Sequence, residues 1–126
     1  HVLGFVSNMQ TLMRSADLFL TKPGGLSTSE AAALGLPMVL IDAVAGCEEH
    51  NLDFFVSRGA AVTADGAEAL CVLAMSILRD DARLDAMSAS LRRATEITPA
   101  EMIYQTICKA LEETKNVPQE DENVYA

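Results

Sequence analysis

The chain has 126 residues, of which 50% are apolar and 21% are charged, and its net charge at pH 7 is −9. This length suffices for one compact domain with a hydrophobic core, since domains run to roughly 100–200 residues. The surplus of acidic side chains excludes non-specific nucleic-acid binding and a polybasic membrane anchor, because both depend on clustered Lys and Arg. Composition therefore favours a single globular domain that does not bind nucleic acid.

The three cysteines, Cys47, Cys71 and Cys108, are widely spaced and form no cluster with one another or with histidine. This pattern predicts neither a disulfide framework nor a metal site, and it is typical of a reducing compartment. The longest apolar stretch, residues 31–41, is far shorter than the roughly 20 residues that cross a bilayer. No transmembrane segment or signal peptide is expected, and because the chain opens on His1 we expect it to be a piece of a longer protein.

In the first two thirds of the chain, short apolar runs alternate with amphipathic stretches, which is the pattern of βα units around a parallel sheet. The apolar runs lack polar alternation, as expected for strands that helices cover on both faces. The predicted strands are residues 2–6, 18–21, 38–41 and 60–63. The pattern therefore predicts an α/β fold.

Four helix starts are marked by a capping residue that is followed three positions later by Glu or Gln. These pairs are Ser7 and Gln10, Ser27 and Glu30, Asp65 and Glu68, and Thr98 and Glu101. After residue 64, apolar residues recur at helical spacing over 70–78, 84–91 and 103–111, and these stripes are predicted to pack against the sheet and one another. The acidic residues 116–126 are expected to form a disordered tail.

The segment Thr-Lys-Pro-Gly-Gly-Leu-Ser-Thr-Ser-Glu, residues 21–30, joins a predicted strand to a predicted helix. It falls at the carboxyl end of a parallel strand, where open α/β sheets place their ligands. Gly24 and Gly25 leave the backbone bare, so an anion such as a diphosphate can approach the free N–H groups of the helix start. Two glycines are also typical of a tight turn, and the spacing alone favours neither interpretation.

Two roles are open to Glu30. It can reach back to Ser27 and close a capping box, or it can accept hydrogen bonds from both hydroxyls of a ribose near the phosphate position. A second polar cluster, residues 47–51 with the sequence Cys-Glu-Glu-His-Asn, follows the predicted strand 38–41. Its side chains can hydrogen-bond a sugar ring, or they can form an acidic helix N-terminus with an exposed His50.

Several motifs stand in a distinctive order along the first half of the chain. They are Gly4-Phe5-Val6, Met9, Ala16-Asp17, Thr21-Lys22-Pro23-Gly24-Gly25-Leu26, Glu30-Ala31, Gly35-Leu36-Pro37, Glu48-Glu49, Asn51 and Gly59-Ala60-Ala61. This order resembles the donor-binding half of GT-B glycosyltransferases, in particular the processive diacylglycerol glucosyltransferases and monogalactosyldiacylglycerol synthases. These enzymes are relatives of MurG, the N-acetylglucosaminyltransferase of peptidoglycan synthesis.

The resemblance covers about half of the chain, from His1 to roughly Val62. It implies a Rossmann-like, three-layer parallel sheet that forms part of the C-terminal domain of a GT-B enzyme. On this interpretation residues 1–115 are the UDP-sugar-binding domain, incomplete at its N-terminus, and residues 116–126 are the acidic tail.

The resemblance also implies a role for each matching residue. Phe5, Val6 and Met9 would contact uracil, and Glu30 would hold the ribose diol. The diphosphate would lie against Gly24, Gly25, Leu26 and Ser27, whereas Cys47 and Glu48 would face the hexose, with Asn51 supporting that loop. Similar enzymes usually carry Gln at the position of Cys47, and a thiol is a weaker hydrogen-bonding group than an amide.

Taken together, these roles imply the donor-binding part of a transferase that moves a hexose from a UDP-sugar to a lipid acceptor, most directly diacylglycerol. UDP-sugar is the donor substrate, and no cofactor or metal is implied. The acceptor site and the general base are expected in an N-terminal domain that this chain lacks, so the chain alone is expected to be inactive. The complete protein is expected in the cytoplasm, at the face of the membrane.

Two alternatives stand beside this interpretation. The first is a domain like UDP-N-acetylglucosamine 2-epimerase, which shares the fold and a Gly-Gly…Glu loop. Lys22 and Pro23 count against it, because an acidic residue and Ser are expected before the glycines there. The second alternative is a standalone donor-binding subunit without catalytic activity of its own.

Overall fold

The computed structural model describes residues 1–96 and 99–115. The chain divides into two units, residues 1–96 and residues 97–126. The acidic tail predicted for residues 116–126 lies outside the described residues, and the single domain predicted for residues 1–115 stays a prediction. No helix in the described ranges is long and apolar enough to cross a bilayer.

The first unit alternates helices and strands, as the sequence pattern predicts. Its elements are α1 (Met9–Arg14), β1 (Phe19–Thr21), α2 (Gly25–Leu34), β2 (Met38–Leu40), α3 (Cys47–Ser57), β3 (Ala61–Val62), α4 (Ala67–Ile77) and α5 (Asp81–Ala94). The strands form a parallel sheet in the order β1-β2-β3, with Leu20 beside Val39 and Val39 beside Val62. The strands predicted at 18–21, 38–41 and 60–63 are therefore confirmed.

The strand predicted over residues 2–6 is wrong. The structure has irregular backbone there, and the side chains of Val2 and Phe5 are completely exposed. A strand is stable only when its backbone groups pair with a neighbour. Within the described residues β1 pairs with β2 alone, and no strand lies along its other edge.

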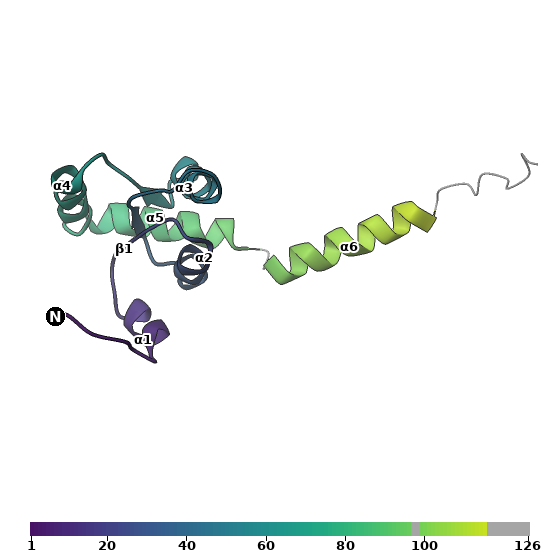
Figure 1. Ribbon diagram of the computed structural model, residues 1–126, viewed down its shortest axis with the longest axis horizontal. Helices are drawn as coiled ribbons and strands as arrows, with labels where there is room; N and C mark the ends of the chain where they lie inside the picture. Colours follow the sequence, from purple (N-terminus) through teal and green to yellow (C-terminus); the bar gives the residue numbers. More distant parts are fainter. Residues whose placement is uncertain (97–98, 116–126) are drawn as a thin grey trace, which may run out of the picture. The chain divides into compact units, whose positions relative to one another are not determined.

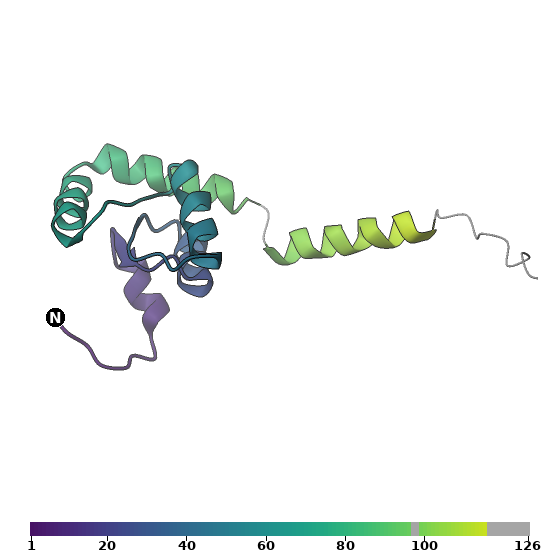
Figure 2. The ribbon, with the colours of Figure 1, turned by 45° about the horizontal axis from the view of Figure 1, so that its top comes forward.

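Successive strand residues point to opposite faces of the sheet, and those of β2 are buried on both. Helices accordingly cover both faces. Met38 and Leu40 belong to a first core cluster, together with buried residues of α2 and α3. Val39, which lies between them in sequence, belongs to a second cluster with Ala74 and Ile77 of α4. Figure 1 shows the resulting layers, with α4 on one side of β1 and both α2 and α3 on the other. Helix α5 contributes Leu91 to the first cluster and Met87 to the second, and Figure 2 shows it lying across the layers.

None of the three capping boxes predicted within the first unit forms. The helices there begin at Met9, Gly25 and Ala67, and no side chain caps their N-termini. At the start of α5, by contrast, the Asp80 carboxylate accepts a hydrogen bond of 3.0 Å from the backbone N–H of Arg83.

The second unit contains α6 (Pro99–Lys115). This helix begins at Pro99, as predicted, whereas Thr98 lies outside the described residues. Its apolar stripe includes Ile103, Ile107 and Leu111, all of which are exposed. The packing of this stripe against the sheet stays a prediction.

Alanine variants of two strand leucines test how deeply β1 and β2 are buried. Leu40 is fully buried in β2, whereas the side chain of Leu20 in β1 is 47% exposed. We expect Leu40→Ala to lower the free energy of unfolding by about 2–5 kcal/mol, because it removes core contacts and leaves a cavity. Leu20→Ala should cost less than about 2 kcal/mol. Urea denaturation measures both values, and equal losses would contradict the observed burial of the two strands.

Candidate functional site

The loop between β1 and α2, residues 22–24, is anchored by Thr28. The backbone N–H and the hydroxyl of Thr28 both donate to the Gly24 carbonyl, at 3.1 and 2.9 Å, and the Thr28 side chain is buried. Helix α2 consequently begins at Gly25 with Gly24 as its N-cap. The first N–H groups of a helix, here those of Gly25, Leu26 and Ser27, have no partner within the helix. No side chain caps this N-terminus, so these groups can bind an anion.

The fold itself does not require Gly24 and Gly25. Gly24 has φ −70° and ψ 140°, which any residue adopts, and Gly25 does not have a positive φ. A Cβ atom at either position would come no closer than 3.9 Å to a neighbouring atom, which is an ordinary contact. The interpretation of this pair as a turn that requires glycine conformations is therefore wrong. Glycine is a common N-cap residue, but the fold would accept a side chain at both positions.

Glu30 is free to bind a ligand. Because α2 begins at Gly25, Ser27 lies inside the helix and cannot act as the N-cap of a box with Glu30. The capping-box interpretation is therefore wrong. Glu30 is exposed and has no hydrogen-bond or ion-pair partner among the described residues. Residues three and four positions apart share a helix face, so Glu30 lies on the face of Ser27 and Leu26, one turn after the free N–H groups.

The acidic residues at the start of α3 bind the backbone of their own loop. Glu48 accepts a hydrogen bond of 2.8 Å from the N–H of Val44, and Glu49 accepts one of 3.1 Å from the N–H of Gly46. Both carboxylates also lie where the helix dipole favours negative charge. Cys47 and His50 are exposed. The structure thus has the acidic helix N-terminus that the sequence suggests. Glu48 binds Val44 through Oε2 alone, and its Oε1 takes no part in that hydrogen bond.

The loop between β1 and α2, residues 22–24, is called the glycine loop, and it lies beside the start of α3. The side-chain amide of Asn51 donates a hydrogen bond of 2.9 Å to the carbonyl of Pro23. The Cβ position of Gly24 is 3.9 Å from Oε1 of Glu48, and that of Gly25 is 3.9 Å from Nδ2 of Asn51. The structure therefore brings the segment predicted to bind diphosphate together with the segment predicted to face the hexose.

Sequence reasoning missed the contact between Asn51 and Pro23, which are 28 residues apart. The available signal was that both polar segments follow strands. Because the carboxyl ends of adjacent parallel strands meet at one sheet edge, the pairing of β1 with β2 places the two segments together.

The residues predicted to contact uracil precede or begin α1. Phe5 is completely exposed, Met9 is about half-exposed at 48%, and Val6 is partly buried. No hydrogen bond joins this segment to the glycine loop in the part of the chain that the structure describes. The uracil contacts therefore stay a prediction.

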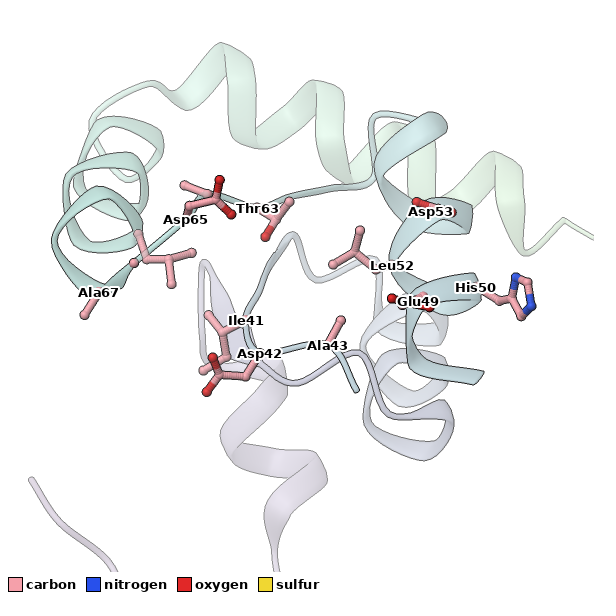
Figure 3. Close-up of a pocket in the computed structure, with 13 residues that line it drawn as sticks. Ile41, Asp42, Ala43, Glu49, His50, Leu52, Asp53, Thr63, Asp65 and Ala67 are labelled. Carbon is pink, nitrogen blue, oxygen red and sulfur yellow. The ribbon is translucent and has the colours of Figure 1, made fainter. Parts of the chain in front are cut away.

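A cavity of about 720 Å³ lies at the carboxyl edge of β2 and β3, beside α3 and the start of α4 (Figure 3). None of the predicted substrate-binding residues lines it. Its lining has no Lys or Arg and contains the carboxylates of Asp42, Glu49, Asp53 and Asp65. These charges repel a diphosphate, so this cavity does not suit an anion. Among the described residues, no three His, Cys, Asp or Glu side chains are placed to hold a metal ion.

Residues 1–94 match the protein family described as Glycosyl transferases group 1. The chain is 35% identical over 111 residues to the processive diacylglycerol beta-glucosyltransferase of Bacillus subtilis, an alignment that covers 88% of this chain and 29% of that protein. For the enzyme of the same description from Bacillus licheniformis, identity is 33% over 117 residues, with 93% and 30% covered. For that of Bacillus cereus (strain AH187) it is 37% over 106 residues, with 84% and 27% covered.

The chain thus spans less than a third of the length of these relatives. The predicted resemblance to diacylglycerol glucosyltransferases is confirmed, and so is the Rossmann-like fold of a GT-B C-terminal domain. On the family match and the relatives together, the chain belongs to the group 1 glycosyl transferases.

Proposed function

We propose that this chain is the nucleotide-sugar-binding part of a glycosyltransferase that moves a hexose from a UDP-sugar to a lipid acceptor, most directly diacylglycerol. The names of the relatives, which are diacylglycerol beta-glucosyltransferases, support the transferase class and the lipid acceptor. They also favour this function over a 2-epimerase. Because these relatives are more than three times as long as their match to this chain, the acceptor site and the general base would be supplied by polypeptide outside it.

The proposal rests on a helix N-terminus that carries no side chains although the fold would accept them. Gly24 and Gly25 could carry a methyl group without strain, and yet neither has a side chain. No side chain caps the N–H groups of Gly25, Leu26 and Ser27, and the helix dipole favours an anion beside them. Two phosphate groups of a nucleotide diphosphate supply the charge, and the absent side chains leave room for their oxygens.

Charge orients the donor along this site. Glu48 Oε1 lies next to Gly24, and a carboxylate repels phosphate but accepts hydrogen bonds from sugar hydroxyls. The uncharged hexose is therefore expected toward α3 and the exposed Cys47. Glu30, free and one turn along α2, would accept hydrogen bonds from the ribose diol on the nucleoside side. The diphosphate would occupy the position between them.

The chemistry is displacement at the anomeric carbon of the hexose. The acceptor hydroxyl oxygen bonds to that carbon while the bond from the carbon to the diphosphate oxygen breaks, and the hydroxyl proton passes to the general base. Negative charge accumulates on the departing UDP. Fixed backbone N–H groups already aimed at the diphosphate would stabilise that charge without reorganisation, which is the most effective form of electrostatic catalysis.

Gly25→Ala separates folding from ligand binding. The variant should be as stable as the parent or gain up to about 1 kcal/mol, because alanine fits this backbone and restricts the unfolded chain. Its affinity for UDP should fall about tenfold or more, since the methyl group blocks charge-assisted hydrogen bonds worth about 1.5–3 kcal/mol. Thermal unfolding and isothermal titration calorimetry measure the two quantities.

Gly35→Ala is the matched control for Gly25→Ala. Gly35 has φ +67°, and a Cβ atom there would lie 3.2 Å from the hydroxyl of Ser88. This variant should lose more than about 1 kcal/mol of stability. The UDP affinity of its folded fraction should be unchanged. If Gly25→Ala binds UDP as tightly as the parent chain, the glycine loop is not the diphosphate site.

Nucleotide preference tests the identity of the donor. We expect the chain to bind UDP more tightly than ADP or GDP, although weakly, because the uracil contacts predicted for Phe5, Val6 and Met9 would be only partly assembled. Titration calorimetry with the three nucleotides under identical conditions measures the preference. Equal affinities would show that the chain recognises only the diphosphate, and would remove the support for a uridine donor.

Glu30→Gln tests the ribose contact. The variant should keep the stability of the parent chain to within about 0.5 kcal/mol, as usual for an exposed side chain without partners. Its UDP affinity should fall about tenfold, because an amide accepts hydrogen bonds from the diol less strongly than a carboxylate does. Glu68→Gln, in the first turn of α4, is the control and should change nothing in UDP binding. Equal UDP affinities for both variants would place the ribose elsewhere.

A further inference from the structure

The glycine loop is held from two sides. Thr28, within α2, donates two hydrogen bonds to the Gly24 carbonyl. Asn51, from α3, donates one hydrogen bond of 2.9 Å to the carbonyl of Pro23, the residue immediately before the glycines. Pro23 is fully buried and Asn51 is half-buried, so this contact is shielded from competing water.

These three hydrogen bonds hold two successive carbonyl groups and so fix two successive peptide planes. A peptide group is planar, so its carbonyl and the N–H of the following residue point in opposite directions. Thr28 holds the carbonyl of Gly24 and thereby sets the direction of the Gly25 N–H. Asn51 holds the carbonyl of Pro23 and thereby sets the direction of the Gly24 N–H. No acceptor for the Gly24 N–H exists among the described residues, so this group is available beside those of Gly25, Leu26 and Ser27.

Among the described residues, Asn51 is the hydrogen-bond donor to the peptide group that carries the Gly24 N–H. Glycine has no Cβ and rotates more freely about its backbone bonds than any other residue. A side-chain amide offers both a donor and an acceptor, but a carbonyl only accepts, so the NH2 group of Asn51 must face Pro23. An anion site of backbone N–H groups binds well only when those groups are already aimed at the ligand.

We infer that Asn51 is a positioning residue of the diphosphate site: by holding the Pro23 carbonyl, it aims the Gly24 N–H at the phosphate oxygens. This inference rests on the proposed function, in which the loop binds the diphosphate of a UDP-sugar. On this inference Asn51, which lies in α3, acts on the loop before α2 by holding its backbone, and it does not contact the donor itself.

The test uses the 126-residue chain, labelled with ¹⁵N, and UDP as the probe. Asn51→Ala removes the donor, and Asn51→Asp keeps the shape of the side chain but replaces the NH2 group by an oxygen that repels the Pro23 carbonyl. Asp53→Ala, two residues further along α3 and exposed, is the matched control. Backbone amide spectra of Gly24 and Gly25, thermal unfolding, and the UDP dissociation constant well below the melting temperature are measured for each.

Both Asn51 variants should shift the Gly24 amide signal and raise the UDP dissociation constant about tenfold, the effect of one lost charge-assisted hydrogen bond. Asp53→Ala should do neither. If Asn51→Ala unfolds, the Gly24 amide signal of the isosteric Asn51→Asp supplies the comparison, because its added carboxylate repels UDP by itself, and an unshifted signal would overturn the inference. If the Asn51 variants melt earlier but bind UDP like the parent chain, Asn51 is only structural and the inference is overturned, while the proposed function stands. If the parent chain itself does not bind UDP, the proposed function fails and the inference fails with it.

Discussion

The parallel pairing of β1 with β2 is the constraint on which the rest of the site depends. The register sets Thr21 beside Leu40, so the segments that follow the two strands leave the sheet at the same edge. One segment carries the bare glycines and the other carries the acidic start of α3. Their contacts, the hydrogen bond from Asn51 to Pro23 and the approach of Glu48 to Gly24, exist only because this register holds. The buried side chains of Met38, Val39 and Leu40 maintain it from both faces.

The glycine loop shows how a functional requirement can be separated from a folding requirement. Among the glycines of the chain, Gly35 adopts a backbone conformation that other residues rarely reach, whereas Gly24 and Gly25 do not. The fold would accept side chains at the latter two positions. Departures from what the fold alone would accept are expected at sites that bind something else.

The sequence predicts those parts of the fold that are decided locally. Three strands were predicted to within one residue at each end, because uninterrupted apolar runs between helix-forming stretches identify buried strands. Residues 2–6 carry the same signal but form no strand, since pairing depends on a neighbour that the local sequence does not specify. The capping box at Ser27 does not form because Thr28 hydrogen-bonds to Gly24, so the helix begins at Gly25, three residues before the start that a Ser27 cap would give. The proximity of Asn51 to Pro23 could not be predicted without knowing which strands are adjacent.

The two anchors of the glycine loop differ in how far apart their partners lie along the chain. Thr28 reaches a carbonyl four residues away, so its hydrogen bonds form together with the first turn of α2. Asn51 reaches across 28 residues, so its contact requires β1 and β2 to be paired and α3 to be in place. Long-range contacts carry a larger loop-closure cost than local ones do. A chain with its helices formed but its sheet incomplete would therefore hold the glycine loop by Thr28 alone. Nucleotide affinity would then report the completion of tertiary structure and not merely the presence of α2.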